Sequence, residues 1–384
     1  MKKIVGIIAA VAMAASVFAV DFTAGFQLKA DLFNYNGTTE DMGALKLWNE
    51  NSKDDKPFIF TIGEDRAGGT LKFYDSEKGA LDSDLGAHAY SIWFKPFDML
   101  KIELGSQDIK LNCEHISWWM GNIVGGKLNN WDGIGDWGYK ASVNVDAFTV
   151  ALAFLPGNDA FWFSKAKDGD ALIKETTLYA EYAADFGKIN FIFDIKANAV
   201  AEKEYDTGVV DPTDPNGGNF VIKYNEVEKT NLKVGAGYNN TFGDLGFFAD
   251  VAFFLKKMEA SFDFMGTTFD FGYDQKSVAI DADVSYNKDA FGAEAYVFWK
   301  ANTLDAVQKE TMDLALFLKA SYALNGGTLY AKFYDYDLFA DKFASEIHIG
   351  YDGNLGCLAY EVEAAIDVAE KVNFSVPCYF RIGF

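Results

Sequence analysis

The sequence predicts an all-β protein: a transmembrane antiparallel β-barrel of about 18 strands, with 16 strands as the alternative. Three observations lead to this prediction. Apolar and polar residues alternate along many segments, short and long connections between these segments alternate, and no long apolar run follows the first twenty residues. The 35 glycines and the aromatic content of 16% among 384 residues agree with it, because all-β barrels routinely exceed the usual length of one domain.

The charge balance limits the partners that the chain can bind. Acidic residues number 56 against 34 basic ones, which gives a formal net charge of -22. Binding to a polyphosphate needs a basic surface, so we expect no nucleic-acid partner. Hydrophobic residues make up 50% of the chain, which is too high a fraction for a disordered acidic protein.

The first 19 residues predict a secretory signal peptide. Lys2 and Lys3 form a short basic start, an apolar run extends from Ile4 to Val17, and Ala19 is the small residue before the expected cleavage point. The apolar run is shorter than the roughly 20 residues that a membrane-spanning helix needs. We therefore expect cleavage after Ala19 and a single barrel domain over residues 20–384.

Period-2 alternation is clearest at the C-terminus. From Phe374 to Phe384, every second position is Phe, Val, Cys, Phe, Ile and Phe, whereas the positions between them are mixed. The stretches from Leu358 to Val368 and from Phe22 to Leu32 repeat this pattern. Such segments are typical of strands that have one apolar face.

The connections between these segments fall into two kinds. Short ones, such as Asp146–Ala147 and Leu324–Gly327, alternate with longer polar ones: Tyr35–Lys56, Asp75–Gly86, Asp108–Asp136, Pro156–Lys174, Ala201–Glu228 and Ala301–Thr311. A chain that crosses a membrane back and forth gives this arrangement, with short periplasmic turns and long extracellular loops. Its sheet must close, because lipid offers no partner to the backbone groups of an open edge. The short candidates Phe58–Gly63 and Thr70–Tyr74 decide between 18 strands and 16.

The signal peptide, the alternating hairpins and the last strand, Val376-Pro377-Cys378-Tyr379-Phe380-Arg381-Ile382-Gly383-Phe384, resemble bacterial outer-membrane β-barrel proteins, and the size resembles that of a porin. The resemblance implies that the barrel-assembly machinery reads the last strand, at Val376, Phe380, Ile382 and Phe384. It also implies a location in the outer-membrane lipid, with a homotrimer as a candidate assembly.

The same resemblance implies that the loop after the fifth strand folds inward and narrows the pore. Here that loop is about residues 108–136, and it contains Trp118, Trp119 and Trp131. Glu114, Asp132 and Asp136 would then be the acids nearest the constriction. In the alternative interpretation, the tryptophans pack an outer loop cap or a contact between subunits.

If the apolar faces meet lipid, the opposite faces line the lumen. Acids outnumber bases on these faces, most clearly in the last third of the chain, where the lumen-facing acids are Asp281, Asp283, Glu294, Glu346, Glu361, Glu363 and Asp367. Charges of one sign on the wall of a pore concentrate counter-ions. The sequence therefore predicts a lumen that favours cations.

The motifs of enzymes and metal sites are weak in this chain. The string from Gly133 to Gly138 fits a dinucleotide-binding pattern, but it precedes a strand and opens no helix. Cys113 and His115 lack a second pair of ligands. We therefore expect no enzymatic activity, no cofactor and no metal.

These observations favour an outer-membrane porin that lets small hydrophilic solutes and ions diffuse passively. One alternative is a sugar-selective channel, in which Trp118, Trp119, Trp131 and Tyr139 would form an aromatic slide. The other is a surface-exposed β-barrel adhesin whose long loops carry the function.

Overall fold

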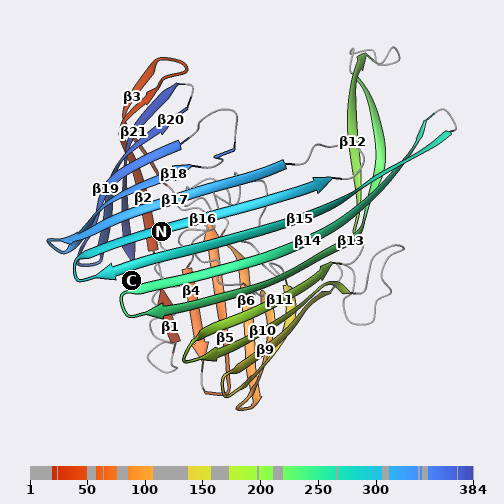
Figure 1. Cartoon of the computed structure of the whole chain (residues 1–384), viewed down its shortest axis with the longest axis horizontal. Coiled ribbons are helices and arrows are strands. Elements are labelled where there is room, and N and C mark those ends of the chain that lie inside the picture. The colour runs from red at the N-terminus through yellow and green to blue at the C-terminus, as the bar shows by residue number, and fades with distance from the viewer. Residues whose placement is uncertain are drawn as a thin grey trace.

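β-Strands make up the regular structure of the described part of the chain in the computed structural model (Figure 1). The structure describes residues 20–23, 25–49, 58–63, 65–75, 85–106, 137–156, 173–196, 199–210, 219–264, 267–304, 311–335, 338–339, 345–369 and 371–383. Within these ranges, no helix has the length and the apolar character that crossing a membrane requires.

The strands form one antiparallel sheet of 21 segments. These are β1 (Val20–Thr23), β2 (Gly25–Asn36), β3 (Asp41–Asn49), β4 (Phe58–Gly63), β5 (Ala67–Asp75), β6 (Leu85–Phe97), β7 (Leu100–Ser106), β8 (Trp137–Val145), β9 (Phe148–Pro156), β10 (Ile173–Ala184), β11 (Gly187–Lys196), β12 (Ala199–Val210), β13 (Asn219–Phe242), β14 (Leu245–Phe264), β15 (Thr267–Lys288), β16 (Phe291–Leu304), β17 (Thr311–Leu324), β18 (Gly327–Asp335), β19 (Ser345–Leu355), β20 (Leu358–Val368) and β21 (Val372–Gly383).

Three pairs of consecutive segments share a position in the sheet. β1 and β2 follow each other along one position, and β3 and β4 follow each other along the next. β3 pairs with β2 from Asn36↔Asp41 onward, and β4 continues the ladder along β1 as far as Val20↔Ile62. β11 and β12 likewise pair in succession with β13. The 21 segments therefore occupy 18 positions among the described residues, which confirms the predicted number of about 18 strands.

The strand pairing leads from the last strand back to the first. β21 pairs with β20 and with β2, and β1, which precedes β2 by one residue, pairs with β4. This order of neighbours is that of an antiparallel β-barrel. The sheet curves strongly, with β4 to β6 behind β14 to β17 in the view of Figure 1.

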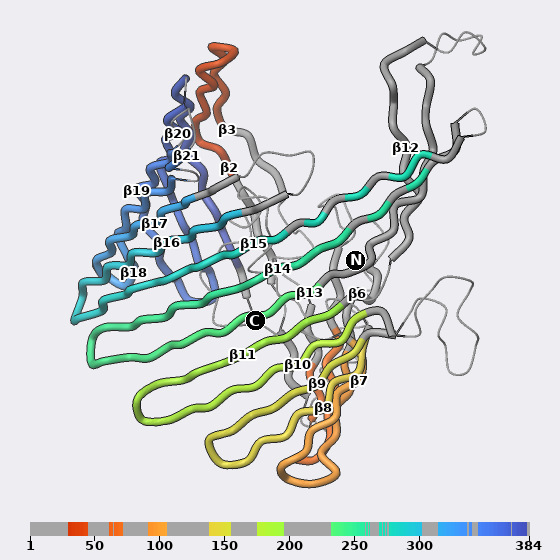
Figure 2. The backbone as a smooth tube through the Cα atoms, turned by 45° about the vertical axis from the view of Figure 1, so that its right-hand side comes forward, coloured from red at the N-terminus to blue at the C-terminus, as the bar shows by residue number. Residues whose placement is uncertain are grey.

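Tight two-residue turns connect the hairpins at one end of the sheet (Figure 2). We call this end the short-turn end; its turns are residues 98–99, 146–147, 185–186, 243–244, 289–290, 325–326 and 356–357. Asn325 and Gly326 both have positive φ, 51° and 80°. A turn with two positive φ angles matches the right-handed twist of the strands that it joins, and Asn-Gly is the favoured pair for it.

Two of the predicted long connections contain strands, so their predicted bounds are wrong. β3 lies within residues 35–56, because the chain reverses just after Asn36, whose Oδ1 accepts hydrogen bonds from the backbone N–H groups of Thr38 (2.8 Å) and Thr39 (3.3 Å). An Asn side chain that bonds its own backbone two residues on is a common turn former. β12 and β13 fill most of residues 201–228.

β13, β14 and β15 are also longer than predicted, at 24, 20 and 22 residues. A strand needs about 9–11 residues to cross the bilayer, so these three extend past the membrane on the side opposite the short-turn end. In Figure 1, β12 and its hairpin partner rise away from the rest of the sheet. The polar stretches that the sequence predicted as loops therefore do not mark where these strands end.

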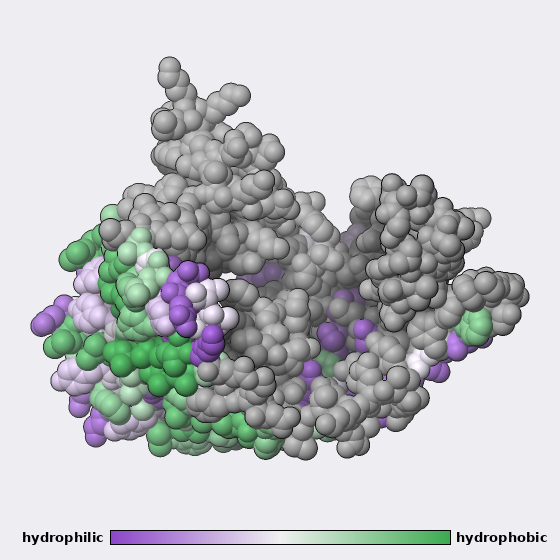
Figure 3. All heavy atoms as spheres, turned by 90° about the horizontal axis from the view of Figure 1, so that it is seen from above, coloured by the Kyte–Doolittle hydropathy of each residue, from purple (hydrophilic) through white to green (hydrophobic). Residues whose placement is uncertain are grey.

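The two faces of the sheet differ in chemistry, as the alternation predicts. The outward face carries exposed apolar side chains such as Ile349 (53% exposed) and Val362 (38% exposed), whereas charged side chains lie on the concave face. Seen from above, hydrophobic residues gather on the lower left of the outer side, among some hydrophilic ones, and hydrophilic residues appear inside the hollow (Figure 3). This distribution fits a wall with lipid outside and water inside.

Aromatic rings pair with each other on the outward face near the short-turn end. Ring centroids lie 4.6 Å apart for Phe148 and Tyr182, and 6.1 Å apart for Tyr351 and Tyr360. Membrane proteins place such aromatic belts at the level of the lipid headgroups. The short-turn end therefore lies at one surface of the membrane.

Two tyrosines of the outward face, Tyr351 and Tyr238, lie over glycines of the neighbouring strand. A Cβ added to Gly327 would meet the ring and hydroxyl of Tyr351, whose hydroxyl donates to the carbonyl of Leu324 at 3.0 Å. Gly187 and Tyr238 repeat the arrangement, with a hydrogen bond of 2.6 Å to the carbonyl of residue 186. The glycines thus leave room for a ring that ties one hairpin to the next.

Candidate functional site

The concave face of β16 to β19 carries a row of charged side chains. In the register of the strands, Glu294 faces Lys319, Lys319 faces Lys332, and Lys332 faces His348. We call these four residues the charged row. Because directly opposed residues in an antiparallel pair have their Cβ atoms about 4.5–5.5 Å apart, these groups act on one another electrostatically.

A second row on the same face is aromatic. Phe248, Tyr296, Phe317 and Tyr334 lie in register across β14 to β18, with Asp283 between the first two. The rings of Phe317 and Tyr334 are 4.9 Å apart, and those of Phe248 and Tyr296 are 6.3 Å apart. Tyr296 is 1% exposed and Phe248 is 7% exposed, so this row belongs to a packed layer on the inner wall.

His348 lies between two carboxylates. Its Nδ1 is 2.6 Å from Oε1 of Glu363, and its Nε2 is 2.9 Å from Oε2 of Glu346. The imidazolium form donates a hydrogen bond from each nitrogen, so it satisfies both contacts at once. The ring also packs edge-on against Tyr334, at 5.1 Å between centroids.

Tyr330 and Lys332 extend this group toward the short-turn end. The Tyr330 hydroxyl lies 2.5 Å from Oε1 of Glu361 and 2.8 Å from Oε2 of Glu363. Lys332 Nζ is 3.8 Å and 3.5 Å from the same two oxygens, and 4.2 Å from the centroid of the Tyr330 ring. One lysine and one hydroxyl therefore hold two neighbouring carboxylates together.

We call this group the His348 network; it consists of Tyr330, Lys332, Glu346, His348, Glu361 and Glu363. Three carboxylates stand against the ammonium of Lys332 and the ring of His348. The group therefore carries a net negative charge whether the imidazole is charged or neutral. Asp367, which faces Glu346 across the strand pair, adds a further acid at its edge.

Acids elsewhere on the concave face have other surroundings. Asp250 and Asp281 are directly opposed and buried, and the Tyr296 hydroxyl lies 3.3 Å from Oδ2 of Asp281. Directly opposed like charges destabilise a strand pair unless other groups offset them. Glu103 lies between Lys101 and Lys140, each 2.8 Å away, so two lysines compensate its charge.

The seven acids predicted to face the lumen lie on the concave face, at positions that alternate with apolar residues on β15, β16, β19 and β20. The structure brings Glu346, Glu361 and Glu363 into one network. The six residues expected at the constriction, Glu114, Trp118, Trp119, Trp131, Asp132 and Asp136, lie outside the described residues. Val376, Phe380 and Ile382 lie in β21, and Phe384 also lies outside the described residues.

Sequence reasoning missed several residues of this site. Tyr330 and Lys332 had not been singled out, although the alternation of apolar and polar residues in β18 would have placed both on the inner face. His348 had not been singled out either. Tyr139, expected in an aromatic slide, stacks on Phe154 at 5.1 Å on the outward face, while the next residue, Lys140, points to Glu103 on the concave face.

Comparison with known proteins identifies the fold. No protein-family model matches the chain, and no curated protein matches it. OmpT of Vibrio cholerae, expressed in the outer membrane, is similar over 95% of this chain and 97% of that chain, with 12% identity and a TM-score of 0.52. The trimer form of in-vitro folded OmpT is similar over 95% and 99%, with 13% identity and a TM-score of 0.52. A refined porin structure aligns with 94% of this chain and 100% of that chain, at 12% identity and a TM-score of 0.45.

Proposed function

We propose that this chain, which has the fold of porin-like outer-membrane β-barrels, is a passive channel for small hydrophilic solutes that favours cations. The observation that carries the proposal is the negative His348 network on the concave wall. Passive diffusion needs neither a gate nor an energy source. The network acts through its charge alone, because solutes diffuse along the lumen according to their size and charge.

The preference for cations follows from the charge of the wall. Glu346, Glu361 and Glu363 lie within one group that contains a single lysine. Fixed charge on a low-dielectric wall raises the local concentration of ions of opposite sign. Salt screens this effect over about 10 Å at 0.1 M, so the selectivity weakens as ionic strength rises.

The loop at about residues 108–136 is the proposed constriction. Its tryptophans give it a large apolar area that needs a partner, and the aromatic row supplies an apolar surface on the concave wall. Replacing the loop tryptophans Trp118 and Trp119 by alanine should widen the pore and raise the single-channel conductance. An unchanged conductance would place the loop outside the lumen.

Export and assembly complete the proposal. The chain crosses the inner membrane by its signal peptide, and the barrel-assembly machinery then inserts it into the outer membrane. A homotrimer is the first assembly to test, because one of the similar structures is a trimer form.

Planar-bilayer recording under a gradient of potassium chloride tests this function. The wild-type protein should give a reversal potential of the sign for cation selectivity. Replacing Glu361 and Glu363 by Gln and Asp367 by Asn should move that potential toward zero. As the matched control, Glu259→Gln removes a carboxylate from the odd-numbered, outward side of β14, where it pairs with Lys257 at 3.2 Å, and should change nothing.

Two results would contradict the proposal. Anion selectivity of the wild-type channel would show that the His348 network does not set the field in the pore. A folded protein without any conductance would favour the surface adhesin.

The sugar-selective alternative receives less support from the wall. A sugar slide needs exposed aromatic rings along the path, and the rings of Tyr296 and Phe248 are almost completely covered. Block of the current by maltose or another oligosaccharide would revive that alternative.

A further inference from the structure

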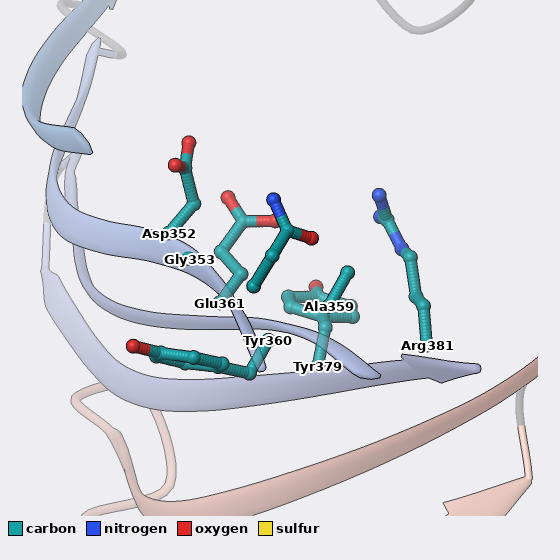
Figure 4. A pocket seen from close by; sticks show the side chains of 8 residues that line it. Asp352, Gly353, Ala359, Tyr360, Glu361, Tyr379 and Arg381 are labelled. Atoms are coloured by element: carbon teal, nitrogen blue, oxygen red, sulfur yellow. The ribbon is translucent and has the colours of Figure 1, made fainter. Parts of the chain in front are cut away.

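A pocket of about 220 Å³ opens on the concave wall at the short-turn end (Figure 4). It is built on the last three strands, with two rows of three inner-face residues. In the first row Asp352 faces Glu361, and Glu361 faces Tyr379; in the second row Asn354 faces Ala359, and Ala359 faces Arg381. The pocket therefore depends on the register of β19, β20 and β21.

The hollow arises because a small residue lies among longer ones. Ala359 has only a methyl group, whereas Asn354 and Arg381 flank it and Glu361 and Tyr379 stand in the adjacent row. In Figure 4, Asp352, Glu361 and Arg381 point to the same side of the sheet, away from the ring of Tyr360. A larger side chain at residue 359 would fill this space.

The two ends of the pocket carry opposite charges. Asp352 and Glu361 are directly opposed, so two carboxylates meet at one corner, where Glu361 also accepts a hydrogen bond from Tyr330 and lies 3.8 Å from Lys332 Nζ. Arg381 occupies the diagonal corner, two strands and two residues away, which corresponds to roughly 12 Å between Cα atoms. The Asn354 amide and the Tyr379 hydroxyl lie between them and can donate or accept hydrogen bonds.

Arginine is rare in this chain, which makes the position of Arg381 informative. The only other arginine, Arg66, lies in an exposed turn and pairs with Asp98 at 3.3 Å. A guanidinium binds a carboxylate through two parallel hydrogen bonds, which a lysine cannot do. The pocket thus combines one of the chain's two guanidinium groups with two carboxylates.

We propose that this pocket binds small zwitterionic solutes, of the size of an amino acid or a dipeptide. The ammonium group of the solute lies against Asp352 and Glu361, and its carboxylate lies against Arg381. The pocket is smaller than the sites of drug-sized ligands, which measure about 300–1,000 Å³. This proposal rests on the proposed channel function, because a solute reaches the pocket through the lumen.

Isothermal titration calorimetry on the purified, detergent-solubilised barrel tests the pocket directly. The probes are β-alanine and glycylglycine as zwitterions, propionate as the matched anion and propylamine as the matched cation. The zwitterions should bind at least about tenfold more tightly than either singly charged probe, because each end supplies a charge-assisted contact.

Variants assign the binding to the pocket. Arg381→Gln should weaken binding of the zwitterions about tenfold or more and leave propylamine unchanged. Ala359→Leu should weaken all the probes by filling the hollow. Arg66→Gln, which changes the other arginine, is the matched control and should have no effect. If Arg381→Gln does not fold, Arg381→Lys keeps the charge but loses the paired hydrogen bonds, and it should still weaken zwitterion binding.

Three outcomes would overturn the proposal: equal binding of propionate and β-alanine, equal binding of propylamine and β-alanine, or no heat with any probe. Conductance measured on the same preparation separates this failure from failure of the channel function. A conducting barrel that binds no zwitterion leaves the channel in place and removes the pocket. A barrel that binds zwitterions but does not conduct supports the pocket and removes the channel.

Discussion

Val362 offers the most direct test of which face of the sheet meets lipid. It lies on the outward face of β20, between Tyr351 and Cys378 in the register, and is 38% exposed. It is five positions after Cys357 in the turn, which is about 17 Å along the strand and about 13 Å along the membrane normal at a tilt near 40°. That depth is close to half of an apolar band about 25 Å tall, so the backbone of Val362 lies near the midplane. The ring of Tyr351, which faces Val362, extends from this level toward the short-turn end, where its hydroxyl donates to the carbonyl of Leu324.

A lysine at that depth has to leave water or distort the bilayer. We expect Val362→Lys to lower the free energy of unfolding by about 2–4 kcal/mol, the cost of a lysine at the midplane of a membrane barrel. The measurement is equilibrium unfolding by urea in phosphatidylcholine vesicles, followed by tryptophan fluorescence.

The matched control places a lysine on the other face of the same strand. Ala359→Lys enters the pocket on the concave face, where Arg381 directly faces it and the carboxylate of Glu361 lies in the adjacent row, so its cost should stay below about 1 kcal/mol. If both variants lose the same free energy, the assignment of faces is wrong, because a slip of one residue exchanges the two faces of a strand.

Three further predictions concern packing, topology and assembly. Gly327→Val should destabilise the barrel by about 1–3 kcal/mol, since its side chain would meet the backbone oxygen of Asp352 and the ring of Tyr351; a thermal melt on heated and unheated gel samples measures this, and an unchanged melting point would remove the packing role of the glycine. In a Cys113→Ser background, a membrane-impermeant maleimide should label Cys357, which is exposed in a turn at the short-turn end, only after the outer membrane is permeabilised; labelling on intact cells would reverse the orientation. Deleting Phe384 should leave the protein in the periplasm or degraded, as fractionation and immunoblotting would report, and normal outer-membrane levels would argue against its role in assembly.

The sequence by itself determined which face of each strand a residue occupies. Side chains alternate strictly along a strand, so the apolar Val362, Ala364 and Ile366 and the polar Glu361, Glu363 and Asp367 had to fall on opposite faces. The tight turn at Asn325-Gly326 was also predictable from local sequence, because these two residues can adopt two positive φ angles at low cost.

The tertiary structure decided which residues on one face become neighbours. A slip of two residues leaves every side chain on its own face and changes all its partners, so alternation cannot distinguish the two registers. The contacts of His348 with Glu363 and of Tyr330 with Glu361 link residues 15 and 31 positions apart, and each depends on the register between strands. The pocket around Ala359 depends on two such registers at once. Register is fixed by hydrogen bonds along the whole ladder and by the geometry of each turn. The charges of the wall depend only on which face a residue occupies, so the sequence predicts them. The His348 network and the pocket depend on register, so the sequence alone does not.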